Sequence, residues 1–205
     1  CDALLRDEHR DVRRAALRAA ATLRSRRLLS GVTQCFLHRG PREEAAAALA
    51  ALGWDGLDAL EEILQDPSAP PDRQHQAVRT LGEINAPQSG ARLTQLLGHR
   101  DHALRYAAGR ALVRLLQRTT AFEGPSGVVI RARILNEVRV GYLLRHLIRG
   151  AETLDSPCEP PLLLGELRRR LRACEDHIFT LLSLMDRHGA SAMVLDNLRR
   201  GDAKQ

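Results

Sequence analysis

The residues best suited to metal chemistry are two histidines in one short stretch. His99 and His102 are three positions apart in the sequence GHRDH, a spacing at which two imidazoles can share a metal ion. No third ligand follows at a suitable spacing, and Asp101, which lies between them, is a residue type that caps helix N-termini. We therefore expect a turn with Asp101 as the N-cap of the next helix, rather than a metal site.

Other arrangements that carry catalysis are missing from the sequence. No Gly-rich phosphate loop and no G-x-S-x-G elbow occurs, and the adjacent Glu61 and Glu62 suggest a solvated helix face. The cysteines are far apart and form no C-x-x-C pair, which predicts neither a zinc site nor a disulfide framework: Cys1, Cys35, Cys158 and Cys174. We expect no catalytic residue, no cofactor and no metal, and hence no enzyme. Reduced thiols favour the cytoplasm.

The basic charge of the chain raises the question of an anionic partner. The net charge is +6, and Lys204 is the only lysine among 31 basic residues. This excess of arginine is also what a bacterial genome rich in G and C produces, so an ordinary solvated surface would explain it. An electrostatic binder of nucleic acid or of an anionic membrane surface is the less favoured alternative. Its N-terminal arginines would be Arg6, Arg10, Arg13, Arg14, Arg18, Arg24, Arg26 and Arg27.

The elements that must position such residues recur about every thirty residues. Four segments align, starting at Val12, Glu44, Arg73 and Leu104, and successive starts lie 32, 29 and 31 residues apart. Their fifth and ninth positions are always alanine or leucine: Ala16, Ala48, Ala77 and Ala108, then Ala20, Leu52, Leu81 and Leu112. An alanine in mid-helix lets a neighbouring helix approach closely, and a leucine one turn later fills the groove beside it.

Each segment leads into a second apolar helix, so the repeating unit is a helical hairpin. The second helices are predicted within residues 28–37, 57–64 and 91–97. Gly53 and Gly82 are expected to end two first helices in a left-handed conformation. A single hairpin cannot bury its apolar face, but stacked hairpins can. The sequence therefore predicts an all-α fold in which residues 1–118 form a right-handed α-solenoid of about four units, the first and last atypical.

These units resemble short bacterial HEAT repeats. Besides the alanines and leucines, two residue pairs that open a first helix carry the resemblance: Val12-Arg13 and Leu104-Arg105. In that family the arginine often joins an aspartate in a ladder between units, which Asp11 and Asp101 would continue here. The ladder would break in the middle units, where Ala45 and Gln74 replace the arginine.

The resemblance implies a non-catalytic scaffold whose second helices line a surface for protein contact. An enzyme built on the same repeats is the least favoured alternative. The partner would be another protein or another domain of the same polypeptide. Trp54, between two helices, is expected to fix a hairpin rather than to stack on a nucleic-acid base. The expected contact residues are the polar positions of the second helices: Ser30, Thr33, Gln34, Glu61, Gln65, Arg92 and Gln95.

A different pattern follows the connector at residues 119–127. Two longer helices are predicted within residues 128–205, and the second has apolar residues at heptad spacing: Leu164, Leu167, Leu171, Cys174, Ile178, Leu181 and Met185. Burying one Leu or Ile stabilises by about 1.5–3 kcal/mol, so this seam must be covered. We expect it to dock on the preceding helix and the extension to pack on the array as a cap. The alternative is contact with a second copy or with the rest of a parent protein, so the oligomeric state stays open.

The stretch 177–205 resembles part of bacterial HEAT arrays that are attached to membrane carriers of the nucleotide-exchange or major-facilitator type. The residues that carry it are Ile178, Phe179, Leu181, Leu182, Leu184 and the pattern Leu198-x-x-Gly201-Asp202. This resemblance implies a transporter-associated regulatory appendage in the cytoplasm, at the inner face of the membrane. The sequence has no apolar run of the ~18 residues that a span needs. The chain starts at Cys1 within a helical pattern, so we expect it to be a piece of a longer protein.

Overall fold

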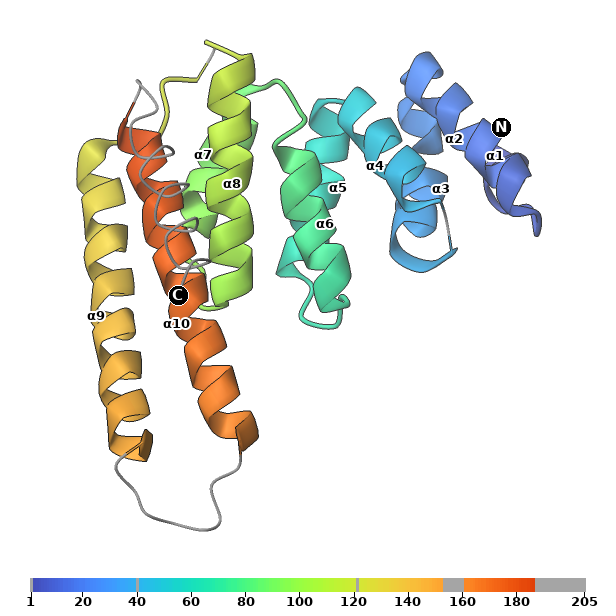
Figure 1. Cartoon of the computed structure of the whole chain (residues 1–205). Coiled ribbons are helices and arrows are strands. Elements are labelled where there is room, and N and C mark those ends of the chain that lie inside the picture. The colour runs from blue at the N-terminus through green and yellow to red at the C-terminus, as the bar shows by residue number, and fades with distance from the viewer. Residues whose placement is uncertain (1, 40, 121, 153–160, 187–205) are drawn as a thin grey trace, which may run out of the picture. The chain divides into compact units, whose positions relative to one another are not determined.

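The chain is helical throughout the part that the structure describes, which comprises residues 2–39, 41–120, 122–152 and 161–186. The structure is a computed structural model, drawn in Figure 1. No strand occurs within the described ranges, which confirms the all-α prediction. The chain divides into two compact units, residues 1–124 and 125–205, which we describe in turn.

The first unit is a row of helical hairpins that stand side by side in chain order (Figure 1). After the short α1 (Asp2–Leu5), the first helices of the repeats are α2 (Arg10–Leu23), α4 (Arg42–Ala51), α6 (Pro71–Leu81) and α8 (His102–Arg118). The second helices are α5 (Trp54–Gln65), α7 (Pro87–Leu96) and a segmented one, made of the 3₁₀ turn η1 (Arg26–Leu28), α3 (Leu29–Gln34) and the π-helical turn η2 (Cys35–Arg39). The predicted helical hairpins are thus present.

Local sequence signals explain where several of these helices begin. Pro71 and Pro87 occupy the first helical positions of α6 and α7, where the missing N–H of proline costs nothing. Asp101 accepts a hydrogen bond from the Ala103 N–H at 2.9 Å, so it caps α8 as predicted. Gly53 joins α4 to α5 with φ of 62°, a conformation that favours glycine.

The alanine positions of the repeat are the centres of the packed helices. Ala16, Ala48, Ala77 and Ala108 lie one in each first helix, and none is more than 3% exposed. Neighbouring first helices contact each other, α2 with α4, α4 with α6, and α6 with α8. The small side chain is therefore used where the hairpins stack, as the repeat pattern predicts.

Gly82 corrects one sequence-based expectation. Its φ is −69°, so it does not end α6 in a left-handed conformation. A Cβ at this position would lie 2.9 Å from the Ala111 Cβ, because the end of α6 lies against α8. Gly56 is tighter still, since its Cβ would lie 1.9 Å from the Leu49 carbonyl oxygen of α4. Both glycines allow two helices to approach closely. A glycine with this role cannot be told in the sequence from one that caps a helix end.

The two arginines expected in a ladder each donate to the carbonyl oxygens of the preceding turn, and the ladder itself stays a prediction. The Arg13 Nη1 donates to the carbonyl oxygens of Asp7 and Glu8 at 2.6 and 2.9 Å. The Arg105 Nη1 does the same to His99 and Arg100 at 2.9 and 3.0 Å. At the equivalent position of the third unit, the Gln74 Nε2 donates to the Asp66 carbonyl oxygen at 3.1 Å. Other ion pairs join neighbouring units: Arg14–Glu44, Arg26–Asp55, Arg42–Asp72 and Arg92–Glu61.

In its described residues, the second unit forms an antiparallel hairpin of α9 (Gly127–Glu152) and α10 (Pro161–Met185). Two ion pairs join the helices, Arg145 with Glu175 at 2.6 Å and Arg168 with Glu152 at 2.7 Å. They lie seven residues apart on each helix, which fits the heptad seam of α10. Leu171 of this seam lies 3.8 Å from where a Cβ on Gly141 would be, so the seam faces α9. Packing of this extension on the array stays a prediction.

Candidate functional site

Four of the seven residues predicted to bind a partner line one groove of the first unit. Glu61 and Gln65 lie on α5, and Arg92 and Gln95 lie on α7. The groove has a volume of about 530 Å³. We call it the α5–α7 groove; it is also lined by Leu64, Pro67, Gln74, Leu81, Leu96, His99, Arg100 and Asp101.

The four polar side chains form a continuous hydrogen-bonded chain across two units. The Gln65 Nε2 donates to Glu61 Oε1 at 3.1 Å, and the Arg92 Nε lies 2.9 Å from Glu61 Oε2. The Arg92 Nη1 also donates to Gln95 Oε1 at 3.3 Å. The guanidinium and carboxylate are partly exposed, so a ligand can reach them and replace part of this network. The pair itself stabilises the array by at most about 1 kcal/mol.

The loop between α7 and α8 supplies a part of the groove that sequence reasoning missed. His99 Nδ1 accepts a hydrogen bond from the Asp101 N–H at 3.1 Å. Because Nδ1 accepts this bond, Nε2 is the ring nitrogen that can donate to a ligand. Leu64, Leu81 and Leu96 provide the apolar part of the lining. The sequence marks this loop as a turn but gives no sign that it faces α5.

The remaining three predicted residues lie one unit upstream. Ser30, Thr33 and Gln34 are on α3, where Ser30 and Gln34 are exposed and Thr33 is half-buried. None of them lines the α5–α7 groove. The second helices therefore share a pattern of polar positions, but only two of them contribute to this groove.

Four of the eight arginines in the N-terminal cluster form ion pairs among the described residues. Arg14 lies 2.9 Å and Arg18 3.6 Å from the same Glu44 carboxylate. Arg6 pairs with Asp2 at 3.4 Å, and Arg26 pairs with Asp55 at 3.3 Å. These contacts reduce the free positive charge that an electrostatic nucleic-acid surface would need.

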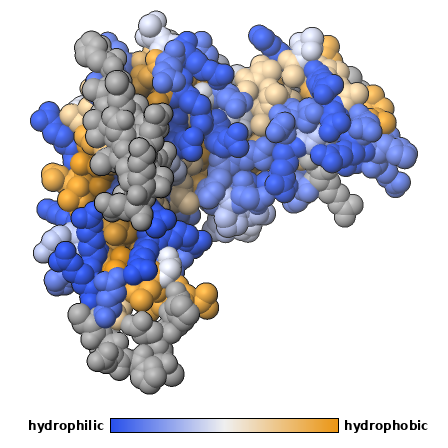
Figure 2. Space-filling model, in the orientation of Figure 1, coloured by the Kyte–Doolittle hydropathy of each residue, from blue (hydrophilic) through white to orange (hydrophobic). Residues whose placement is uncertain are grey.

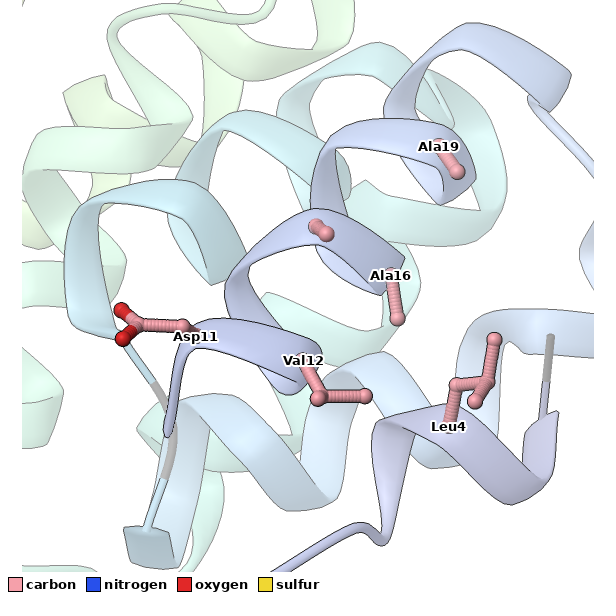
Figure 3. A pocket seen from close by; sticks show the side chains of 6 residues that line it. Leu4, Asp11, Val12, Ala16 and Ala19 are labelled. Carbon is pink, nitrogen blue, oxygen red and sulfur yellow. The ribbon is translucent and has the colours of Figure 1, made fainter. Parts of the chain in front are cut away.

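A second hollow, of about 560 Å³, lies on the first repeat and is almost wholly apolar. Figure 3 shows it between Leu4 of α1 and the face of α2 that carries Val12, Ala16 and Ala19. In the last unit the position of Ala19 is taken by Ala111, which faces the preceding helix α6. The hollow is therefore the stacking face of a first helix, only partly covered by α1.

Cys35 and Trp54 lie outside the groove, within the array. Burial raises the pKa of the Cys35 thiol, an effect that the nearby Arg13 charge opposes. Its Sγ donates to the Leu5 carbonyl oxygen at 3.1 Å, which ties the end of α1 to η2. Trp54, expected to fix a hairpin, is 60% exposed at the start of α5. Cys1 and Cys158 lie outside the described residues.

Comparison with known proteins identifies the repeats. A family model described as HEAT repeats matches residues 57–122, and one described as PBS lyase HEAT-like repeat matches residues 41–66. No curated protein matches the chain. None of the described helices is long and apolar enough to cross a bilayer. The matched residues contain the groove and the helices that form it, so residues 41–122 of the chain belong to the HEAT-repeat family.

Proposed function

We propose that the chain is a non-catalytic scaffold that binds a segment of another protein, or of another domain, in the α5–α7 groove. HEAT repeats generally form interaction scaffolds, and HEAT-repeat families are typically non-catalytic. The observation that carries the proposal is the polar chain from Gln65 to Gln95, which lies beside the half-buried Leu64 and Leu96 in one hollow. Such a mixture suits a peptide that inserts an apolar side chain and hydrogen-bonds at its edge.

A ligand of this groove would replace existing hydrogen bonds between groove side chains, because Glu61 and Arg92 already have partners. Arg92 is already neutralised by Glu61, so a bound carboxylate or amide would compete for the guanidinium. The His99 ring offers a further donor from Nε2. The groove therefore favours a partner segment with both an apolar anchor and hydrogen-bonding groups. Because its Arg92 charge is balanced by Glu61, the groove does not favour a highly charged segment.

A photo-crosslinker tests the position of the contact. A benzophenone amino acid placed at Gln95 should capture a partner in cells, whereas the same residue at the exposed Gln34 of α3 should not. Equal capture at both positions, or capture at Gln34 alone, would show that the groove is not the contact surface.

Side-chain removal then tests its energetics with the captured partner. We expect the double change Arg92→Ala and Gln95→Ala to weaken binding about tenfold or more, since central interface residues dominate affinity. The matched change Ser30→Ala and Gln34→Ala should leave affinity unchanged. Thermal melting of both variants should stay close to that of the parent, because the pair that is lost is partly exposed.

We further propose that the module is a cytoplasmic regulatory appendage of a larger protein, of the membrane-carrier kind that the C-terminal resemblance implies. Ile178 to Leu184 of that resemblance lie on α10, while Leu198 to Asp202 lie outside the described residues. The full reading frame tests this proposal: an adjoining region of several apolar spans would support it, and a frame without one would contradict it.

A further inference from the structure

The outer face of α9 combines large apolar side chains with arginines. Tyr142 is 69% exposed, and five other large apolar residues of the same helix are also exposed: Val128, Leu135, Val138, Leu143 and Leu147. Figure 2 shows apolar and hydrophilic surface alternating along the place of α9 in Figure 1. Covering these side chains would remove apolar surface from water, so this face gains from a covering surface.

The charges on this face have one sign. Arg131, Arg139 and Arg149 are exposed, and within the described part of the chain none of them has an ion-pair partner. The two carboxylates of α9 are not available to balance them. Glu137 is buried, and Glu152 pairs with Arg168 at 2.7 Å. An occupant must therefore bring negative charge as well as apolar surface.

These requirements exclude two occupants. A second copy that paired through α9 would place arginines against arginines with no free carboxylate between them, which is repulsive. Nucleic acid would match the charge, but its phosphate backbone offers no apolar surface for six large side chains.

An anionic lipid surface meets both requirements. From Val128 to Arg149 the mixed face extends about 30 Å along one helix at ~1.5 Å per residue. Arginines that lie between apolar residues can reach lipid phosphates while their neighbours enter the acyl boundary. Tyr142, which stacks on His146 with ring centres 6.0 Å apart, is a residue type enriched at membrane interfaces. A protein hot spot would instead place its apolar residues at the centre of a charged rim.

We propose that α9 binds the surface of an anionic membrane, lying in the plane of the headgroups with Leu135, Tyr142 and Leu143 toward the acyl chains. This surface is separate from the α5–α7 groove and does not depend on its ligand.

Vesicle flotation of the whole chain tests the proposal. The protein should float with vesicles of equimolar phosphatidylglycerol and phosphatidylcholine, but not with vesicles of phosphatidylcholine alone. The double change Arg139→Gln and Arg149→Gln should weaken binding about thirtyfold, since each arginine near an anionic surface contributes roughly fivefold. The change Leu135→Ser with Leu143→Ser should also reduce binding, and each variant should keep the parent's helical ellipticity.

Matched variants on the array distinguish binding by α9 from a general effect of the protein's positive charge or exposed apolar surface. Arg10→Gln with Arg27→Gln removes the same charge, and Leu23→Ser removes an apolar residue that is 59% exposed. Both should bind vesicles like the parent. The proposal is overturned if these controls lose binding equally, if neutral vesicles bind as well, if no vesicle binds, or if Leu135→Ser with Leu143→Ser dissolves a dimer instead.

Discussion

The array and the C-terminal hairpin bury apolar residues to different extents. In the array, α4 and α6 expose no large apolar side chain, whereas α9 exposes six. A helix inside a stack has neighbours on several sides, but among the described residues of the second unit α9 packs on α10 alone. The apolar residues on the outer side of α9 are therefore exposed.

Core truncation should give the largest difference between the two regions. Leu49 of α4 is fully buried, so Leu49→Ala should lower the free energy of unfolding by about 2–5 kcal/mol. Leu143→Ala on α9, where the side chain is 62% exposed, should change it by less than about 0.5 kcal/mol. Urea denaturation followed by ellipticity measures both values, and comparable losses would contradict the comparison.

A Gly→Ala substitution should change the free energy of unfolding in opposite directions in the two regions. Gly56→Ala places a Cβ against the Leu49 carbonyl oxygen and should destabilise by about 1–3 kcal/mol. Gly165→Ala on α10 meets nothing within 4 Å, so its better helix propensity should stabilise by about 0.5–1 kcal/mol. The same denaturation experiment decides, and a stabilised Gly56→Ala variant would show that the α4–α5 crossing is looser than described.

The smallest effect concerns pH. A hydrogen bond from Arg170, aided by Arg169, holds the pKa of Glu166 below its ordinary value of 4.5. Because the folded pKa lies below the unfolded one, ionised Glu166 stabilises the folded state above the unfolded pKa. This contribution is lost as the pH falls through the folded pKa. In the Glu166→Gln variant the thermal midpoint should therefore fall less steeply as the pH drops below about 4.5. An unchanged slope would show that these exposed contacts do not affect stability.

The sequence predicts the parts of the fold that depend on a repeating side-chain pattern. Ala48 and Ala77 are buried where the repeat places them, because helix stacking imposes one small residue at each crossing. Asp101 caps α8 because a local hydrogen bond suffices for that role. Gly82 shows where the prediction fails, since a glycine that ends a helix and one that permits contact with Ala111 look alike in sequence.

The α5–α7 groove and the exposed face of α9 are only partly predictable for the same reason. Glu61 and Arg92 were expected at polar positions of second helices, but their pairing depends on how hairpins stack. His99 joins the groove through a loop whose path no periodic pattern encodes. On α9 the exposed apolar residues follow no simple heptad, so the sequence does not predict this face. The regular heptad seam of α10 predicts only the contact between the two helices.

The exposed Trp54 gives the protein a built-in optical reporter. It is the only tryptophan of the chain and is open to water at the corner between α4 and α5. Its emission in the folded protein should already resemble that of a hydrated indole and should be quenched readily by iodide. Global unfolding would then change the emission little, whereas any ligand that settles on this corner of the array would shift it to shorter wavelength.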